Sequence, residues 1–144
     1  AVEIVGTEVD LRNIWIILQL VRRKTNREVE RTCLVEYSLH LNIEEMKELI
    51  GRYGVQAATR HLASSDYQGL VEGMSKFLDD GKPEYSYGLL LKYLRQVACK
   101  NMKGMGIPVA YLLLTYIESL DLSKITLGKF LKIRKEDILS YISI

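Results

Sequence analysis

The sequence predicts an all-α protein, a single compact multi-helix bundle of about eight or nine helices. Pro occurs only at positions 83 and 108, so long stretches carry no helix breaker. No stretch alternates apolar and polar residues as a half-buried strand does, and apolar residues recur at helical spacing along the chain. With 144 residues and 48% hydrophobic content, we expect one helical domain over residues 1–144.

In the first half of the chain, capping residues and breakers place the expected helices. Asp10 can open the first helix, which is apolar around most of its circumference. Asn42 precedes two acids and is a plausible N-cap, and Ser64 or Ser65 can cap a later helix. The helices expected here cover residues 10–24, 28–37, 43–50, 54–62 and 66–78.

In the second half, the run Asp79–Pro83 predicts a clear break between helices. Apolar residues then follow helical spacing from Tyr87 to Ala98, and the glycines around Met105 interrupt the pattern. Pro108 suits the first turn of the next helix. We expect that helix to end at Glu118, a further helix over 121–128 after a brief bend, and a closing helix over 136–142.

A phrase near the start of the chain is repeated near its end. Residues Val9–Ile14 read V-D-L-R-N-I, and residues Leu120–Ile125 read L-D-L-S-K-I. Each copy has an acid between apolar residues, then a polar pair, then Ile. We expect Asp10 and Asp121 to cap, or to occupy the first turn of, the helix that follows, and the two helices to pack in one bundle.

The composition argues against an enzyme and against general nucleic-acid binding. Net charge is only +2, from 20 basic and 18 acidic residues, so an electrostatic partner must be met by local patches. His40 and His61 have no Cys, Asp or Glu at a metal-ligand spacing. No Ser or Cys stands in a nucleophile motif, and the Gly104–Gly106 stretch lacks the Lys-Ser/Thr of a phosphate loop. No catalytic residue, metal or cofactor is expected.

The cysteines and the absence of a signal sequence predict a cytoplasmic protein. Cys33 and Cys99 belong to no metal or redox spacing, and we expect two buried thiols in a reducing compartment. The first residues lack a basic start and a cleavage pattern. The densest apolar run, Ile14–Leu18, is far shorter than the roughly 20 residues of a membrane span.

Two basic clusters are the candidate partner surfaces. Each is either a solvated face or a site for an acidic partner. The nine tyrosines concentrate after residue 84; their chemistry suits interfaces, but their helical spacing favours packing in the core. The first cluster contains Arg22, Arg23, Lys24 and Arg27, at the expected end of the first helix, and the second contains Lys129, Lys132, Arg134 and Lys135, in the last loop.

Several of these phrases resemble one protein family. Glu8–Ile14 resembles the acid-led D-x-x-N opening of a repeat in the C subunit of archaeal-type (A/V-type) ATP synthases, called subunit d in eukaryotic vacuolar ATPases. Ile107–Leu113 resembles the A-Y-L-L segment near the C terminus of that family. An acid-led helix at Asp121, the pair Gly128–Lys129 and a short helix from Glu136 follow in the family's order.

The resemblance implies a non-catalytic adaptor. In that family the subunit sits on the membrane rotor ring and receives the lower end of the central stalk, so it transmits torque in ATP-coupled proton or sodium transport. It implies rotor-ring and central-stalk subunits as partners and a peripheral place on a membrane complex. Members are longer and built from repeated helical modules, and this chain corresponds to the C-terminal module. Whether it is a fragment or a short relative stays open.

Two other functions compete with the adaptor. Residues 122–139 can form a helix-turn-helix with Arg134 and Lys135 entering its second helix, which is typical of a DNA-binding domain. Glu136 and Asp137 would repel phosphates there, so binding to nucleic acid is not expected. The third possibility is a generic helical interaction module in an unrelated complex.

Overall fold

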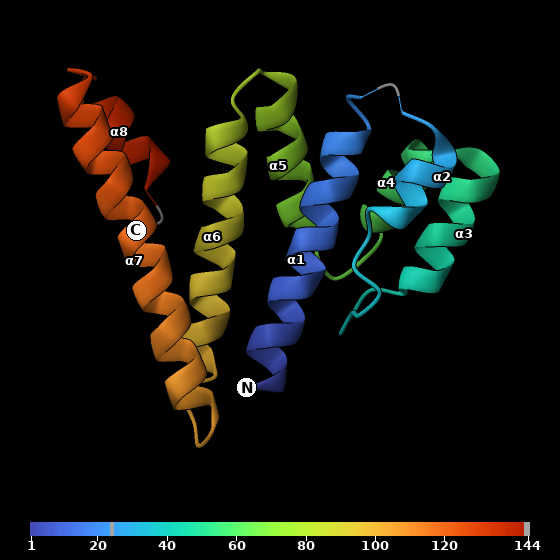
Figure 1. Cartoon of the computed structure of the whole chain (residues 1–144), viewed down its shortest axis with the longest axis horizontal. Helices are drawn as coiled ribbons and strands as arrows, with labels where there is room; N and C mark the ends of the chain where they lie inside the picture. Colours follow the sequence, from blue (N-terminus) through green and yellow to red (C-terminus); the bar gives the residue numbers. More distant parts are fainter. Residues whose placement is uncertain (24, 143–144) are drawn as a thin grey trace. The chain divides into compact units, whose positions relative to one another are not determined.

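The computed structural model of the chain describes residues 1–23 and 25–142. Within these residues it contains eight α-helices and no strand, which confirms the all-α prediction (Figure 1). The helices are α1 (Val2–Leu20), α2 (Arg27–Thr32), α3 (Ile43–Tyr53), α4 (Val55–Leu62), α5 (Gln68–Asp79), α6 (Pro83–Lys100), α7 (Gly106–Phe130) and α8 (Lys135–Tyr141).

Several helix ends follow from the chemistry of single residues. The Asn42 side chain accepts a hydrogen bond from the Glu45 N–H at 3.2 Å and caps α3. Gly54 ends α3 and precedes α4 with a φ of 89°, which is the left-handed region that favours glycine. Pro83 is the first residue of α6, where its missing N–H is not needed.

The expected starts at the two echoed acids are wrong. Helix α1 begins at Val2, so Asp10 lies in its middle, and α7 runs without a bend from Gly106 through Asp121 to Phe130. No Gly or Pro stands between residues 109 and 127, so nothing there breaks the helix. The expected end of the first helix at Lys24 is also wrong, because α1 ends at Leu20; Lys24 itself lies outside the described residues.

The chain divides into two compact units. Residues 5–75 form one unit, and residues 1–4 together with 76–144 form the other, so α1 and α5 contribute to both. Whether they amount to one helical domain over residues 1–144 stays a prediction. The first unit holds α2, α3, α4 and most of α1 and α5. Its fully buried apolar side chains include Leu11, Ile14, Ile17, Leu18, Met46, Ile50, Leu62 and Met74.

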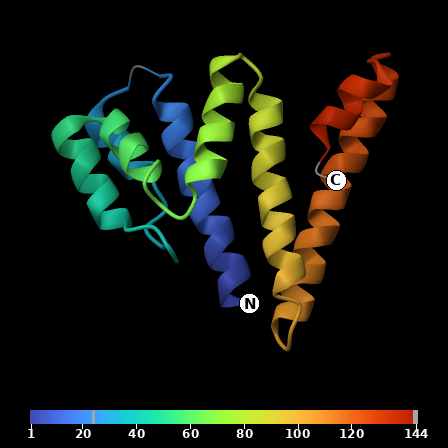
Figure 2. The ribbon, with the colours of Figure 1, turned by 180° about the vertical axis from the view of Figure 1, so that it is seen from behind.

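The second unit is built on a helical hairpin. Helices α6 and α7 run antiparallel and are joined by the short turn over residues 101–105, and α8 folds back against α7 (Figure 2). At the turn end of the hairpin, Ile4, Ala98 and Ala110 form a buried apolar cluster. A Cβ at Gly106 would overlap the Asn101 carbonyl oxygen, so only glycine lets the chain turn this tightly into α7.

Candidate partner-binding surface

Asp10 is fully buried, and its carboxylate binds a loop that is distant in the sequence. The Leu39 N–H donates to Oδ1 at 2.9 Å, and the His40 N–H donates to Oδ2 at 2.8 Å. The Tyr67 hydroxyl donates to the same Oδ2 at 2.9 Å. Three donors surround one carboxylate, which stabilises its charge in the interior. Asp10 is therefore a structural acid that fixes the connection between α2 and α3.

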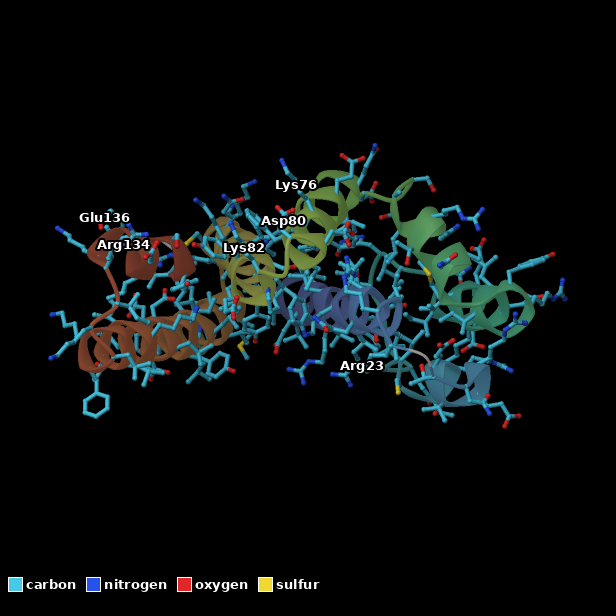
Figure 3. All side chains as sticks on the ribbon, turned by 90° about the horizontal axis from the view of Figure 1, so that it is seen from above. Arg23, Lys76, Asp80, Lys82, Arg134 and Glu136 are labelled. Atoms are coloured by element: carbon cyan, nitrogen blue, oxygen red, sulfur yellow. The ribbon has the colours of Figure 1, made fainter. Side chains whose placement is uncertain are left out.

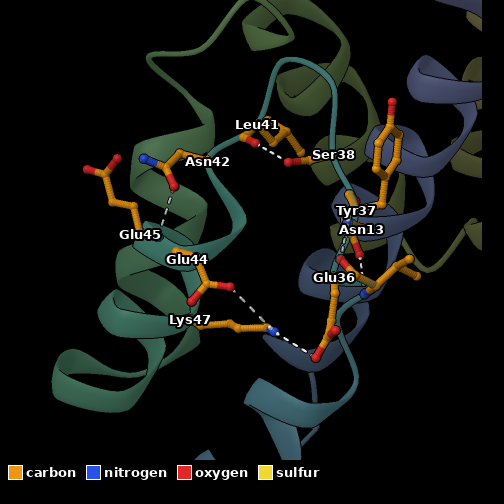
Figure 4. A network of polar contacts seen from close by, with 10 residues as sticks. Asn13, Glu36, Tyr37, Ser38, Leu41, Asn42, Glu44, Glu45 and Lys47 are labelled. Atoms are coloured by element: carbon orange, nitrogen blue, oxygen red, sulfur yellow. Dashed lines mark hydrogen bonds and ion pairs between the residues drawn. The ribbon is translucent and has the colours of Figure 1, made fainter. Parts of the chain in front are cut away.

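Asn13, one helical turn further along α1, binds the same loop. Its side-chain oxygen accepts from the Val35 N–H at 2.8 Å, and its Nδ2 donates to the Val35 carbonyl at 3.1 Å. A longer bond of 3.5 Å reaches the Tyr37 carbonyl (Figure 4). This amide pairs with the backbone as a neighbouring strand would. The D-x-x-N phrase thus places its two polar side chains on one face of α1, where together they hold the loop over residues 33–42.

Close packing and ion pairs also hold the 33–42 loop in place. Gly6 faces Leu39, and a Cβ at Gly6 would lie 2.7 Å from the Leu39 Cβ. The half-buried Lys47 reaches Glu36 at 3.7 Å and Glu44 at 3.9 Å, so α3 is tied to the loop from its other side (Figure 4). The loop is consequently part of the rigid body of its unit.

The second copy of the phrase does comparable work in the other unit. Asp121 is buried in α7, and its carboxylate pairs with Lys124 at 3.3 Å. Lys124 also donates to the Tyr141 carbonyl at 2.9 Å, at the end of α8. Both phrases thus use a buried acid and the polar side chain three residues later, and in both a segment that follows in the chain is held on the helix.

Helix α8 is seated on α7 by shape as well. A Cβ at Gly128 would lie 2.7 Å from Cδ1 and Cγ1 of the buried Ile138, so the absence of a side chain admits Ile138. The Tyr141 ring packs edge-on against Tyr85 of α6, with 5.0 Å between ring centroids. Desolvation raises the pKa of Tyr141 above its ordinary value, and Tyr85 adds to this rise.

The side of α7 that faces away from α6 is exposed and carries large apolar side chains among small polar ones such as Thr115 and Ser119. Leu112 is 68% exposed and Tyr116 is 52% exposed. From residue 106 to 128 the helix carries three charged residues, and of these only Glu118 is exposed. Large apolar residues left open to solvent over several helical turns are typical of a binding surface. We call this surface the α7 face; its residues are Ile107, Tyr111, Leu112, Tyr116 and Leu122.

Sequence reasoning missed this face. The tyrosines were expected in the core, but Tyr111 and Tyr116 are exposed. The sequence does contain a signal for this face. A helix that packs on one neighbour needs an apolar stripe on one side only, whereas α7 is apolar around most of its circumference. The excess of apolar residues therefore indicates a second contact surface. The expected burial of the thiols is wrong as well, because Cys33 and Cys99 are both free and exposed.

The second basic cluster surrounds the end of α7. A local hydrogen-bond pattern ends the helix: the Ile133 N–H donates to the Gly128 carbonyl at 2.9 Å, and the Lys132 N–H donates to the Lys129 carbonyl at 3.1 Å. Lys132 has a φ of 56°, at the position where glycine is usual. Lys129 lies on α7, Lys132 and Arg134 lie in the link to α8, and Lys135 begins α8.

The first basic cluster is divided between structural and exposed residues. The Arg22 guanidinium donates to the Leu18 carbonyl at 2.6 Å and to the Ser75 carbonyl at 3.2 Å. Arg27 donates to the Arg52 carbonyl at 3.1 Å, at the end of α3. Both thus cross-link elements of one unit. Arg23 is exposed (Figure 3), and Lys24 lies outside the described residues, so a partner site at this cluster stays a prediction.

An open cleft of about 360 Å³ lies between α6, α7 and α8. Its lining is mainly apolar and includes Leu127, Ile133 and Ile138, with Glu84 and Lys124 as the charged lining residues. Across residues 1–23 and 25–142, no group of three or more His, Cys, Asp or Glu side chains is placed to hold a metal ion. In the same residues, no helix is both long enough and apolar enough to cross a membrane.

The described residues form an all-helical protein, and its large exposed apolar side chains gather along α7. The model of the ATP synthase (C/AC39) subunit family matches residues 1–141, and the chain therefore belongs to this family. No curated protein and no solved structure matches the chain. Family membership agrees with the resemblance carried by the D-x-x-N phrase and the A-Y-L-L segment, and it makes the chain a subunit of an A/V-type ATP synthase.

Proposed function

We propose that the chain is a non-catalytic adaptor of an A/V-type rotary ATPase, placed between the central stalk and the membrane rotor ring. The single observation that carries the proposal is the family match over residues 1–141. An adaptor that transmits torque must keep its shape. The buried bonds of Asp10 and Asn13 and the close-packed helices supply that stiffness.

We propose the α7 face as the surface that receives the central stalk. From Ile107 to Leu122 this face runs for about 23 Å along a straight helix, since an α-helix rises about 1.5 Å per residue. A long and nearly uncharged helical face is suited to another helix with an apolar stripe. The cations at the far end of α7 lie outside this area.

The test is recovery of partner subunits by the purified chain. We expect the tagged chain to recover central-stalk and rotor-ring subunits. The double variant Leu112→Ser/Tyr116→Ser should lower recovery of the stalk subunit at least about tenfold, because each large side chain contributes about 1.5–3 kcal/mol when buried. Tyr53→Ser is the matched control, since Tyr53 is equally exposed but lies on α3. This control should bind like the parent chain.

Each result decides a different point. If stalk binding survives the double variant, the α7 face is the wrong surface, although the adaptor role stands. If no ATPase subunit is recovered and the chain instead binds duplex DNA in a salt-sensitive way, the adaptor is refuted in favour of a helix-turn-helix domain. ATP-driven ion flux that continues undiminished in a complex that lacks the chain would also contradict a coupling role.

A further inference from the structure

The end of α7 is an apolar projection. Phe130, in the last helical turn, is 81% exposed. Leu127 and Leu131 are each 57% exposed, and Ile133 just beyond the helix is exposed as well. Four large apolar side chains therefore meet solvent within seven residues, beyond what isolated surface apolar residues explain. We call residues 127–135 the α7 tip.

Cations flank these apolar side chains. Lys129, Lys132 and Lys135 are exposed, and within the described part of the chain no acid pairs with any of them. Arg134 donates to Asp137 at 3.0 Å, so its charge is compensated locally. Glu136 is a second acid beside the tip, next to Arg134 in Figure 3. With both acids counted, residues 127–137 keep two positive charges in excess.

We propose that the α7 tip binds an anionic lipid surface, with Phe130 and Leu131 inserted among the headgroups and the three lysines on lipid phosphates. Apolar side chains flanked by lysines are the combination that interfacial binding needs, because the lysine stems are apolar and their amines reach the headgroup charges. The hydrogen bonds that end α7 turn the chain away from the helix axis at Lys132. The side chain of Phe130 therefore stays exposed to solvent.

Charge complementarity favours a lipid surface over a second copy of this chain. Two tips brought together would place six lysines side by side, with four positive charges in excess once the neighbouring acids are counted, which is unfavourable. A membrane needs no matching shape and offers both a negative surface and an apolar layer. The inference does not rest on the proposed function, because vesicle binding requires no other ATPase subunit.

The test is sedimentation of the chain with vesicles. At low salt we expect binding to vesicles of phosphatidylglycerol and phosphatidylcholine, and little binding to phosphatidylcholine alone. Lys129→Gln and Lys132→Gln should each lower the partition coefficient about fivefold, and Phe130→Ser should lower it about tenfold. Lys76→Gln, Lys103→Gln and Tyr53→Ser are matched controls, since these residues are also exposed but lie outside the tip. The controls should bind like the parent chain.

Three results would overturn the inference. The first is no binding to the anionic vesicles at low salt while circular dichroism shows a folded helical chain. The second is binding that the tip variants leave unchanged or that the control variants weaken equally. The third is a concentration-dependent dimer, seen by analytical ultracentrifugation, that Phe130→Ser dissociates; the tip would then join two copies of the chain.

Discussion

At the scale of single residues, the polar groups that matter most lie where the hydrophobic effect alone would not put them. Asp10 and Asn13 are buried on α1 beside apolar side chains such as Leu11 and Ile14, and they bind backbone groups of the 33–42 loop. Buried polar groups are expensive to leave unpaired, so each of these bonds stabilises one loop conformation and disfavours the alternatives.

Asp10→Asn should destabilise the chain by about 3 kcal/mol, because an NH₂ group replaces one acceptor oxygen and faces a donor. Urea unfolding followed by circular dichroism measures this loss. Asp80→Asn is the control: Asp80 is an exposed residue after α5, and its substitution should change the free energy of unfolding by less than about 0.5 kcal/mol. Equal effects of the two variants would mean that the buried bonds contribute nothing specific.

At the scale of elements, the last two helices depend on the few residues that join them. Gly128 lets Ile138 approach α7, and Lys132 adopts the left-handed conformation that redirects the chain toward α8. The same short segment thus fixes how α8 is seated and where the α7 tip projects.

Gly128→Ala should displace α8 and cost about 1–3 kcal/mol, because the new methyl group would overlap Ile138. Hydrogen exchange of the α8 amides should accelerate in this variant. In the double variant Gly128→Ala/Ile138→Ala, the total loss should be smaller than the sum of the two single losses, since the overlap is relieved. Gly69→Ala, where the added Cβ meets nothing within 4 Å, should be neutral or stabilising. A Gly128→Ala variant as stable as the parent would contradict this account of α8.

Lys132→Gly should stabilise the chain by about 0.5–1 kcal/mol, because glycine adopts a positive φ without the steric cost that lysine has. Thermal unfolding measures the change. Lys129→Gly, inside the helix three residues earlier, should have the opposite sign and lose about 0.5–1 kcal/mol. A loss of stability in both variants would show that the left-handed turn at residue 132 is not populated in solution.

At the scale of the whole molecule, features that depend on neighbouring residues could be predicted, and contacts between residues far apart in the sequence could not. The cap at Asn42 and the break before Pro83 depend on neighbours a few residues away, and both were predicted. Asp10 was misplaced because its hydrogen-bond partners lie 29 to 57 residues further along the chain. The cations of the α7 tip form a contiguous cluster that the sequence shows directly. The α7 face was missed because helical spacing does not say which apolar side chains are covered.

The clasp between α1 and the 33–42 loop also sets an order of events for the chain as it is synthesised. Tyr67, the last of the three donors to Asp10, is added 57 residues after it, which at 5–20 residues per second is a delay of roughly 3–11 s. The Leu39 and His40 N–H groups are added 29 and 30 residues after Asp10, so until Tyr67 follows the carboxylate has at most two of its three donors. Burying Asp10 beside Leu11 and Ile14 with a donor missing is unfavourable. The clasp on the first helix is therefore complete only after the residue that precedes α5 has been synthesised.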